Sequence, residues 1–172
     1  MRFREETKTK IEKLMAWMEY LQTKLEYLQG DKDIQPVVKV KVDGGFIPTR
    51  AHAADAGLDI KSPITVTVMG NMSATIDTGV HVAIPKGYVG FLKSKSGLNV
   101  NYGITSEGVI DSGFTGSITV KLYNNSTESY VVHRGDKISQ LVILPILTPQ
   151  IRLVDELEET ERGDNGFGST GR

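Results

Sequence analysis

The sequence predicts a mostly β domain, in the form of a sandwich, jelly roll or barrel, preceded by one helix. After Pro36, apolar residues alternate with polar ones at a period of two, which is the pattern of half-buried strands. Glycine-containing turns separate these segments, and many short strands joined by such turns indicate an all-β architecture. Before Gly30, the apolar residues instead recur at spacings of three and four, as in a helix. With 172 residues, the chain is long enough for one compact domain and an appendage.

The strand predictions rest on this alternation and on the turns that bound it. Alternation is clearest at residues 38–42, 64–68 and 118–122. Further strands are predicted at 79–84, 88–93, 130–133 and 138–144. Turns are predicted at 43–45, 85–87 and 134–136. No helix is predicted after residue 36.

The N-terminal helix is predicted over about residues 5–29, and its apolar residues form the a/d seam of a heptad repeat. The seam residues are Ile11, Leu14, Met18, Leu21, Leu25 and Leu28. Gly30 is well placed to end the helix. Two interpretations stay open: the helix lies on its own domain, or it associates with other copies of itself. The predicted organisation is a helix at 1–30, a linker at 31–36, a β core at 37–154 and a flexible C-terminal segment at 155–172.

Composition excludes several classes of function. A formal net charge of -1 argues against direct nucleic-acid binding, which needs a basic surface. Without cysteine, the chain has no disulfide, no thiolate nucleophile and no cysteine-based metal site. Neither a secretory signal nor a membrane span is recognisable, so we expect a cytoplasmic protein. His52, His81 and His133 lack metal-site spacing and are interpreted as structural.

Five short stretches combine the residue types that bind phosphates and metal ions. They read AADAGLDI at 53–60, SKSGL at 94–98, GVIDSGFTG at 108–116, RGDKISQL at 134–141 and RGDNGFGSTG at 162–171. Carboxylates suit Mg²⁺, cations suit phosphates, and glycines allow close approach of the backbone to a ligand. Taken alone, each stretch is more often an ordinary turn, hairpin or glycine-rich tail.

In this order, the five stretches resemble the motifs of the trimeric dUTPase family, over the chain from about residue 37 to its end. The resemblance implies that Asp111 is catalytic and positions the attacking water. A carboxylate is a weak base, so its orientation matters more than its basicity. The resemblance also implies Mg²⁺ as the cofactor, held by Asp59 through water.

Substrate contacts are implied at twelve further positions. In the second and fourth motifs they are Lys95, Ser96, Gly97 and Gln140, which face the phosphate chain. In the hairpin they are Gly108 and Ile110, whose backbone reads uracil, and Phe114, which packs on the deoxyribose. In the last motif they are Arg162, Phe167, Gly168, Ser169 and Thr170, where the arginine grips the γ-phosphate and the phenylalanine stacks on uracil.

Two of these residues depart from the family pattern. Lys95 stands where arginine is usual, and it keeps the charge but loses the planar two-pronged donor. Phe114 stands where tyrosine is usual, so any hydrogen bond from the phenol is lost. The short spacing from Lys95 to Asp111 resembles that of phage and Gram-positive members.

The resemblance implies a jelly-roll core that forms a homotrimer with active sites shared between subunits. The implied reaction is hydrolysis of dUTP to dUMP and pyrophosphate by attack of water on the α-phosphorus. This reaction limits uracil incorporation into DNA and supplies dUMP for dTMP synthesis. The expected location is the cytoplasm, or the host cytoplasm if the chain is phage-encoded.

Two functions are alternatives to dUTP hydrolysis. A dCTP deaminase shares the fold but uses a glutamate on the strand after the hairpin, where this chain carries Lys121. Lysine cannot act as the same acid and base at neutral pH. The second alternative is a regulatory scaffold that engages a protein partner, such as a repressor, through the helix or the active-site face.

Overall fold

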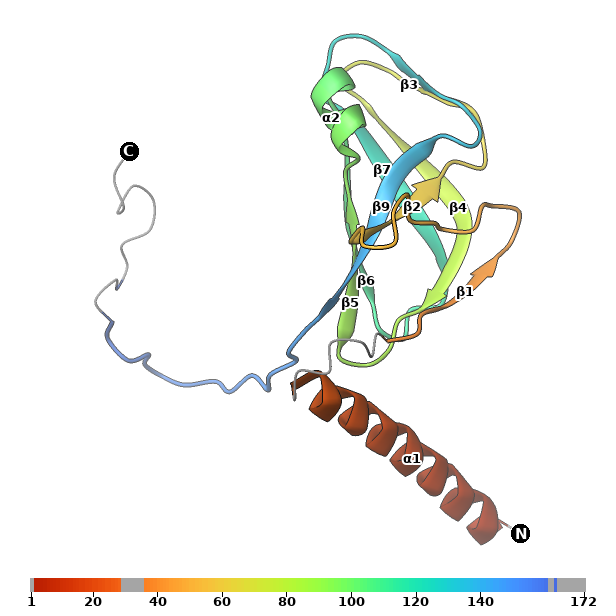
Figure 1. Cartoon of the computed structure of the whole chain (residues 1–172). Coiled ribbons are helices and arrows are strands. Elements are labelled where there is room, and N and C mark those ends of the chain that lie inside the picture. Colours follow the sequence, from red (N-terminus) through yellow and green to blue (C-terminus); the bar gives the residue numbers. More distant parts are fainter. Residues whose placement is uncertain (1, 29–35, 161–162, 164–172) are drawn as a thin grey trace.

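The computed structural model describes residues 2–28, 36–160 and 163. It shows a curled antiparallel β body, a long helix at one end of it, and a C-terminal segment that runs away from it (Figure 1). This arrangement confirms the predicted all-β core with an added N-terminal helix. No helix of the described residues is long and apolar enough to cross a membrane.

Within the described residues, nine strands form two antiparallel sheets. They are β1 (Lys39–Val42), β2 (Gly57–Lys61), β3 (Val66–Val68), β4 (Ser73–Ala83), β5 (Tyr88–Lys93), β6 (Ile104–Asp111), β7 (Ser117–Asn124), β8 (Tyr130–Val132) and β9 (Lys137–Pro145). The larger sheet has the order β1-β4-β7-β6-β5-β9-β2, and β3 pairs with β8 in the smaller one. Strands β1 and β2 are therefore the two edges of the larger sheet.

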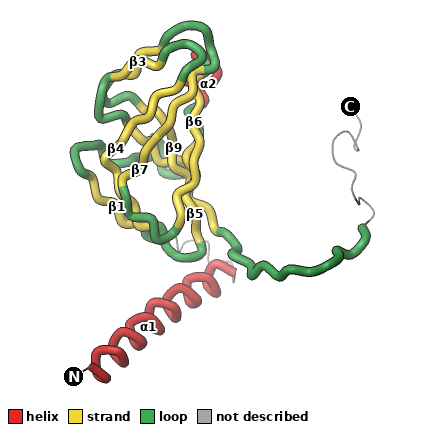
Figure 2. Tube along the Cα trace, turned by 180° about the vertical axis from the view of Figure 1, so that it is seen from behind, coloured by secondary structure: helices red, strands yellow, loops and turns green. Residues whose placement is uncertain are grey.

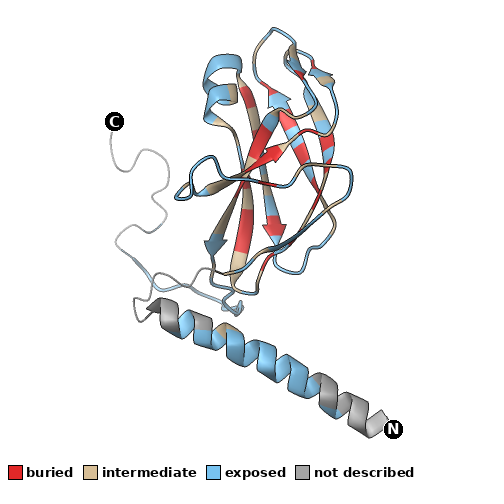
Figure 3. Ribbon diagram, turned by 45° about the vertical axis from the view of Figure 1, so that its right-hand side comes forward, coloured by how far each residue is buried: buried red, intermediate tan, exposed pale blue. Residues whose placement is uncertain are grey.

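The core follows from alternation along the strands, because successive side chains of a strand point to opposite faces. In β7, Ile118, Val120 and Leu122 are completely buried, while the residues between them are exposed. Figure 3 shows the buried positions along the inner faces of the strands. Ile60 and Leu141 extend the same core from β2 and β9.

The long strand β4 contains an irregularity that a buried threonine repairs. Its pairing with β7 shifts register between Asp77 and His81. Within this interval, the Thr78 hydroxyl donates to the Ile118 carbonyl at 2.6 Å and accepts from the Val80 N–H at 3.2 Å. The side chain thus satisfies backbone groups that the shifted ladder leaves unpaired.

All seven predicted strands are present, but two further strands and a short helix were not predicted. The strand β2 was missed because a carboxylate, Asp59, occupies a buried position within it. In β6 the buried Ser106, whose hydroxyl bonds that of Ser139 at 3.0 Å, interrupts the apolar alternation. In both strands the missing signal is a polar side chain at an inward-facing position.

The expectation of no helix after residue 36 is wrong, because α2 spans Ser96–Tyr102. The helix has seven residues, and none of them is buried, so no apolar stripe marks it. It ends at Gly103, which adopts a left-handed conformation with φ of 67° and donates to the Asn99 carbonyl at 2.9 Å.

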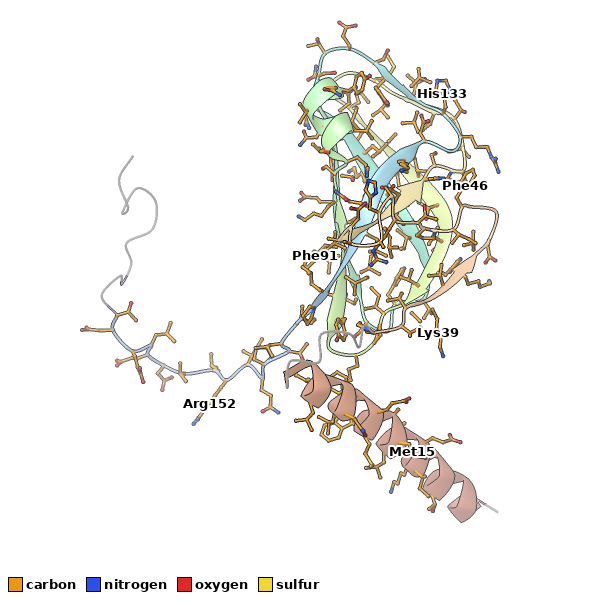
Figure 4. The ribbon with its side chains drawn as sticks, viewed as in Figure 1. Met15, Lys39, Phe46, Phe91, His133 and Arg152 are labelled. Atoms are coloured by element: carbon orange, nitrogen blue, oxygen red, sulfur yellow. The ribbon has the colours of Figure 1, made fainter. Side chains whose placement is uncertain are left out.

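The N-terminal helix α1 spans Arg2–Leu28, and its seam residues from Ile11 to Leu25 are exposed. Seam residues Ile11, Met18 and Leu25 are 51%, 64% and 54% exposed. Met15, which flanks the seam and is labelled in Figure 4, is also exposed. The structure therefore does not show the seam packed on the helix's own domain.

We expect Thr78→Val to lower the free energy of unfolding by about 1–3 kcal/mol, because it leaves the Ile118 carbonyl and the Val80 N–H buried without partners. Thr119→Val is the matched control, since Thr119 lies on the exposed face of β7. Urea unfolding of both variants measures the difference. Equal stability of the two variants would contradict the assigned role of Thr78.

Candidate functional site

The first cluster of predicted site residues lies where β2, β9 and β5 run side by side. Gln140 of β9 stands opposite Asp59 of β2 and opposite Lys93 of β5. Lys95 follows β5 directly, and its ammonium group lies 2.5 Å from one Asp59 oxygen. Three of the five motifs therefore meet here within one chain.

The carboxylate of Asp59 is buried and shared by two lysines. Lys95 contacts Oδ1 at 2.5 Å, and Lys137 contacts Oδ2 at 2.7 Å. Burial alone would raise the pKa of Asp59, but the hydrogen bonds from Lys137 and Lys95 outweigh it and hold the pKa below its ordinary value of 3.8. With both lysines charged, the triad carries one net positive charge, which suits an anionic ligand.

Gln140 fixes the backbone of the neighbouring motif. Its side-chain amide donates to the Ser94 carbonyl at 3.0 Å. The Ser94 hydroxyl in turn donates to the Ser106 carbonyl at 3.0 Å and accepts from the Ser106 N–H at 2.9 Å. These bonds hold the chain just before α2, whose first residues, Ser96 and Gly97, are exposed to solvent.

The second cluster is the turn between β6 and β7, which carries Asp111 and Phe114. Asp111 ends β6 with its side chain exposed, and its carbonyl accepts from the Phe114 N–H at 3.1 Å. The Phe114 ring lies over Gly116, since a Cβ placed there would be 2.7 Å from the ring carbon Cζ. Glycine at 116 is therefore required for this position of the ring.

The two strands of this hairpin separate before they reach the turn. Among the described residues, their pairing covers only Ile104–Ser106 of β6, opposite Leu122–Asn124 of β7. From Glu107 to Asp111, β6 pairs with β5 alone. The side chain of Ile110 is buried. The N–H and carbonyl of Ser106 both bond the Ser94 hydroxyl on the β5 side, so by alternation the backbone groups of Gly108 and Ile110 also face β5. The backbone groups that face the opening are those of Glu107, Val109 and Asp111, not those of the predicted Gly108 and Ile110. An unpaired strand edge presents alternating N–H and carbonyl groups to a ligand.

Polar side chains from β4 support the hairpin. The His81 Nδ1 lies 2.9 Å from the Thr115 carbonyl. The Ser117 hydroxyl donates a hydrogen bond to Asp77, and this bond is the main cause that lowers the Asp77 pKa. Through this contact, His81 holds the turn that carries Asp111, which is consistent with the structural role predicted for it.

One chain does not bring the two clusters together. Asp111 stands opposite Val89 at one end of β5, and Gln140 stands opposite Lys93 at the other. Val89 and Lys93 are four residue steps apart, which separates these positions along the strand by roughly 13 Å. Phe91, labelled in Figure 4, lies on β5 midway between Val89 and Lys93.

Other sequence predictions concern the last motif and the deaminase position. Arg162, Phe167, Gly168, Ser169 and Thr170 lie outside the described residues, so their roles stay predictions. Lys121, at the deaminase glutamate position, is exposed and stacks at 5.0 Å on the Tyr123 ring. Sequence reasoning missed Lys137 as a site residue. The available signal was its charge within the fourth motif.

The donor set fits magnesium only in company with a nucleotide. No group of three potential protein ligands exists among the described residues. Mg²⁺ keeps several waters and is commonly bound by one or two carboxylates and substrate phosphates. Asp59 supplies one such carboxylate beside a cationic, phosphate-compatible corner.

The Asp59 triad generates a prediction about pH. A carboxyl whose folded pKa is lowered contributes stability above its ordinary pKa and loses it as pH falls through the folded value. Lys137→Gln removes one hydrogen bond that lowers this pKa. The free energy of unfolding of this variant should therefore be lower than that of the unaltered chain near neutral pH and should fall less as the pH drops, because less of the Asp59 contribution remains to be lost.

Urea unfolding between about pH 6 and pH 2.5, a window that brackets ordinary carboxyl pKa values, measures how the free energy of unfolding depends on pH. Lys39→Gln is the control, because it makes the same charge change on the exposed strand β1. Identical pH curves for the two variants would show that Lys137 does not stabilise the ionised Asp59.

Comparison with known proteins identifies the family. The dUTPase family model matches residues 44–171, which is more than half of the chain. The deoxyuridine 5'-triphosphate nucleotidohydrolase of Tropheryma whipplei (strain Twist) is 40% identical over 139 residues, covering 78% of this chain and 95% of that protein.

Two phage structures are also similar. The dUTPase of Staphylococcus bacteriophage 80alpha, solved with dUPNHPP, has a TM-score of 0.74 and 34% identity, covering 80% of this chain and all of that one. A mutant dUTPase of phage phi11 of S. aureus, solved to reveal coordination of a structural Mg(II) ion, has a TM-score of 0.66 and 32% identity, covering 72% of this chain and all of that one. The chain belongs to the dUTPase family, whose reaction is the hydrolysis of dUTP to dUMP and pyrophosphate.

Proposed function

We propose that this dUTPase binds dUTP between protomers of a homotrimer and hydrolyses it by attack of water on the α-phosphorus. The observation that carries this proposal is the opening between β6 and β7, which ends at Asp111. An unpaired strand edge lies directly beside a carboxylate that is free to orient water.

The opening suits a pyrimidine base. Uracil presents an N–H donor flanked by two carbonyl acceptors on one edge. The free edge of β6 presents complementary backbone groups at Glu107 and Val109, much as a strand accepts another strand. Phe114 then packs against the deoxyribose, and its ring leaves less room for a 2′-hydroxyl.

Asp111 acts on the water. It accepts a hydrogen bond from the water and orients a lone pair towards the α-phosphorus, and it takes up the proton as the new P–O bond forms. Pyrophosphate leaves with the electron pair of the broken bridge. Positioning supplies most of the rate gain, because a carboxylate is a weak base.

The cationic corner formed by Asp59, Lys95 and Lys137 binds the phosphate chain. Ser96 donates its hydroxyl near the scissile bridge, and Gln140 contacts the α-phosphate while it holds the Ser94 backbone. Mg²⁺, held by Asp59 through water and by the phosphates, would neutralise phosphate charge. At the last motif, Arg162, Phe167 and residues 168–170 close over the γ-phosphate and the base, so residues 155–172 act as a lid.

Two surfaces support assembly into a trimer. A groove of about 720 Å³ lies at the sheet edges. Its lining includes Val38, which precedes β1, Val40 of β1, Leu58 of β2 and Val142 of β9. The segment after β9 is extended and runs away from the body (Figure 2). Its Leu147, Ile151 and Leu157 are 81%, 98% and 87% exposed.

We therefore place the C-terminal segment of one protomer in the groove of the next. An extended segment can add to an open sheet edge while its apolar side chains fill the groove. This arrangement would also bring the phosphate-binding corner of one subunit to the hairpin of another, which the separation within one chain requires. In the cytoplasm, the reaction would limit uracil incorporation into DNA and supply dUMP.

We expect Asp111→Asn to lower kcat for dUTP by about 10²- to 10⁴-fold, the usual range for loss of a general base. Pyrophosphate release is measured with and without Mg²⁺, using dCTP, dTTP and UTP as comparators. An ammonia assay with dCTP tests the deaminase alternative. Undiminished hydrolysis by the Asp111→Asn variant would remove Asp111 from the mechanism.

Shared sites predict recovery of activity in mixed assemblies. Asp111→Asn and Gln140→Ala disable different clusters, so each pure variant should be impaired. Mixed trimers made by joint refolding should contain some sites with both residues intact and regain a measurable fraction of activity. If activity after joint refolding equals the average of the two separate preparations, each site belongs to one chain.

A second candidate function is engagement of a protein partner through the active-site face or the helix. It is favoured by the similarity to phage 80alpha dUTPase, described as controlling transfer of virulence genes by a proto-oncogenic G protein-like mechanism. Absence of hydrolysis with every nucleotide tested would place this function first.

A further inference from the structure

We propose that the α1 helices of three protomers pack through their heptad seams into a parallel bundle that clamps the assembly. This inference rests on the homotrimer proposed above. Each exposed seam is thus covered by the α1 helices of the other two protomers.

The exposed apolar surface on α1 is too continuous for a helix that stays alone in water. Along the seam, Ile11, Leu14, Met18, Leu21 and Leu25 are 51%, 59%, 64%, 42% and 54% exposed. No charged residue occupies a seam position from Ile11 to Leu25. The alternating spacing of three and four is the repeat with which helices interlock with one another.

The helix contacts its own body through a different face. The phenol of Tyr20 packs against Gly87 in the turn between β4 and β5, so closely that a Cβ at Gly87 would collide with it. At 100° per residue, Tyr20 lies roughly 130° around the helix from the middle of the seam. The intramolecular contact therefore orients α1 and leaves its seam available.

The width of the apolar stripe favours more than two helices. Met15 and Trp17 flank the seam on opposite sides and are 64% and 50% exposed. A two-stranded coiled coil covers mainly the narrow a/d seam. In a three-helix bundle each helix meets two neighbours, so residues on both flanks also become covered.

Copies of α1 are favoured over a separate partner by their local concentration. In a threefold assembly, each α1 is anchored at the same turn of its own body, through Tyr20 and Gly87. Helices tethered in this way meet at effective concentrations of about millimolar. That advantage matters because so short a heptad helix is a weak associating unit in isolation.

The absence of native cysteine allows a direct test by cross-linking. Full-length Ile11→Cys and Leu25→Cys variants place a thiol near each end of the seam. Ala16→Cys, on the outer face, is the control. Under copper phenanthroline and dissolved oxygen, a parallel bundle should link Ile11→Cys to itself and Leu25→Cys to itself at least tenfold faster than the control.

The pattern of cross-links separates the alternatives. Linking only in a mixture of Ile11→Cys and Leu25→Cys would show antiparallel pairing and overturn the parallel bundle. Rates equal to that of Ala16→Cys would overturn seam association altogether. In both cases, a trimer seen by sedimentation would leave the proposed function standing.

Sedimentation of a seam variant tests the clamp. In the full-length double variant Leu14→Asp with Leu21→Asp, the protein concentration at which half of the trimer has dissociated, the dissociation midpoint, should rise at least tenfold. The outer-face variant Lys13→Asp with Ala16→Asp should leave it unchanged. Equal midpoints would overturn the clamp, whereas an unaltered chain that is monomeric at micromolar concentration would instead overturn the trimer of the proposed function.

Discussion

The strand β5 is the constraint on which the arrangement of the site depends. It pairs with β6 on one side and with β9 on the other. Because hydrogen-bonded strands cannot slide without turning every side chain to the other face, β5 fixes where Asp111 and Gln140 stand. They occupy opposite ends of it, and a single protomer cannot close the gap. The Asp111 carboxylate and the corner formed by Asp59, Lys95 and Lys137 are thus separated by the same pairing that builds the core.

Asp59, Lys95 and Lys137 together carry one net positive charge, which suits an anionic ligand. A buried carboxylate without a partner would be costly, and Asp59 avoids that cost through two ammonium groups. Both lysines keep some contact with solvent. In the proposed function, this exposure would let them turn to phosphate oxygens. Replacement of the usual arginine by Lys95 fits this arrangement, since a compact ammonium reaches one Asp59 oxygen while Lys137 takes the other.

Both ends of the chain leave apolar residues uncovered for the same reason. The described residues of the α1 seam and of the segment after β9 expose large side chains in a single protomer (Figure 3). The β body already buries its own alternating residues and has no inner surface left for them. In the proposed trimer, association of copies would cover both sets, with the C-terminal segment filling the groove at the sheet edges and the helices packing on one another.

Residue pattern alone determined much of this protein. Alternation predicted seven of the nine strands, heptad spacing predicted α1, and five motifs predicted the family and its reaction. Pattern could not reveal β2, β6 or α2, because Asp59 and Ser106 occupy inward positions and α2 buries nothing. Only the tertiary structure shows that Lys137 contacts Asp59 and that His81 contacts the hairpin. It also shows that Asp111 stands opposite Val89, at the end of β5 away from Gln140. Those relations depend on strand register and on contacts between residues distant in sequence, and local periodicity carries no information about either.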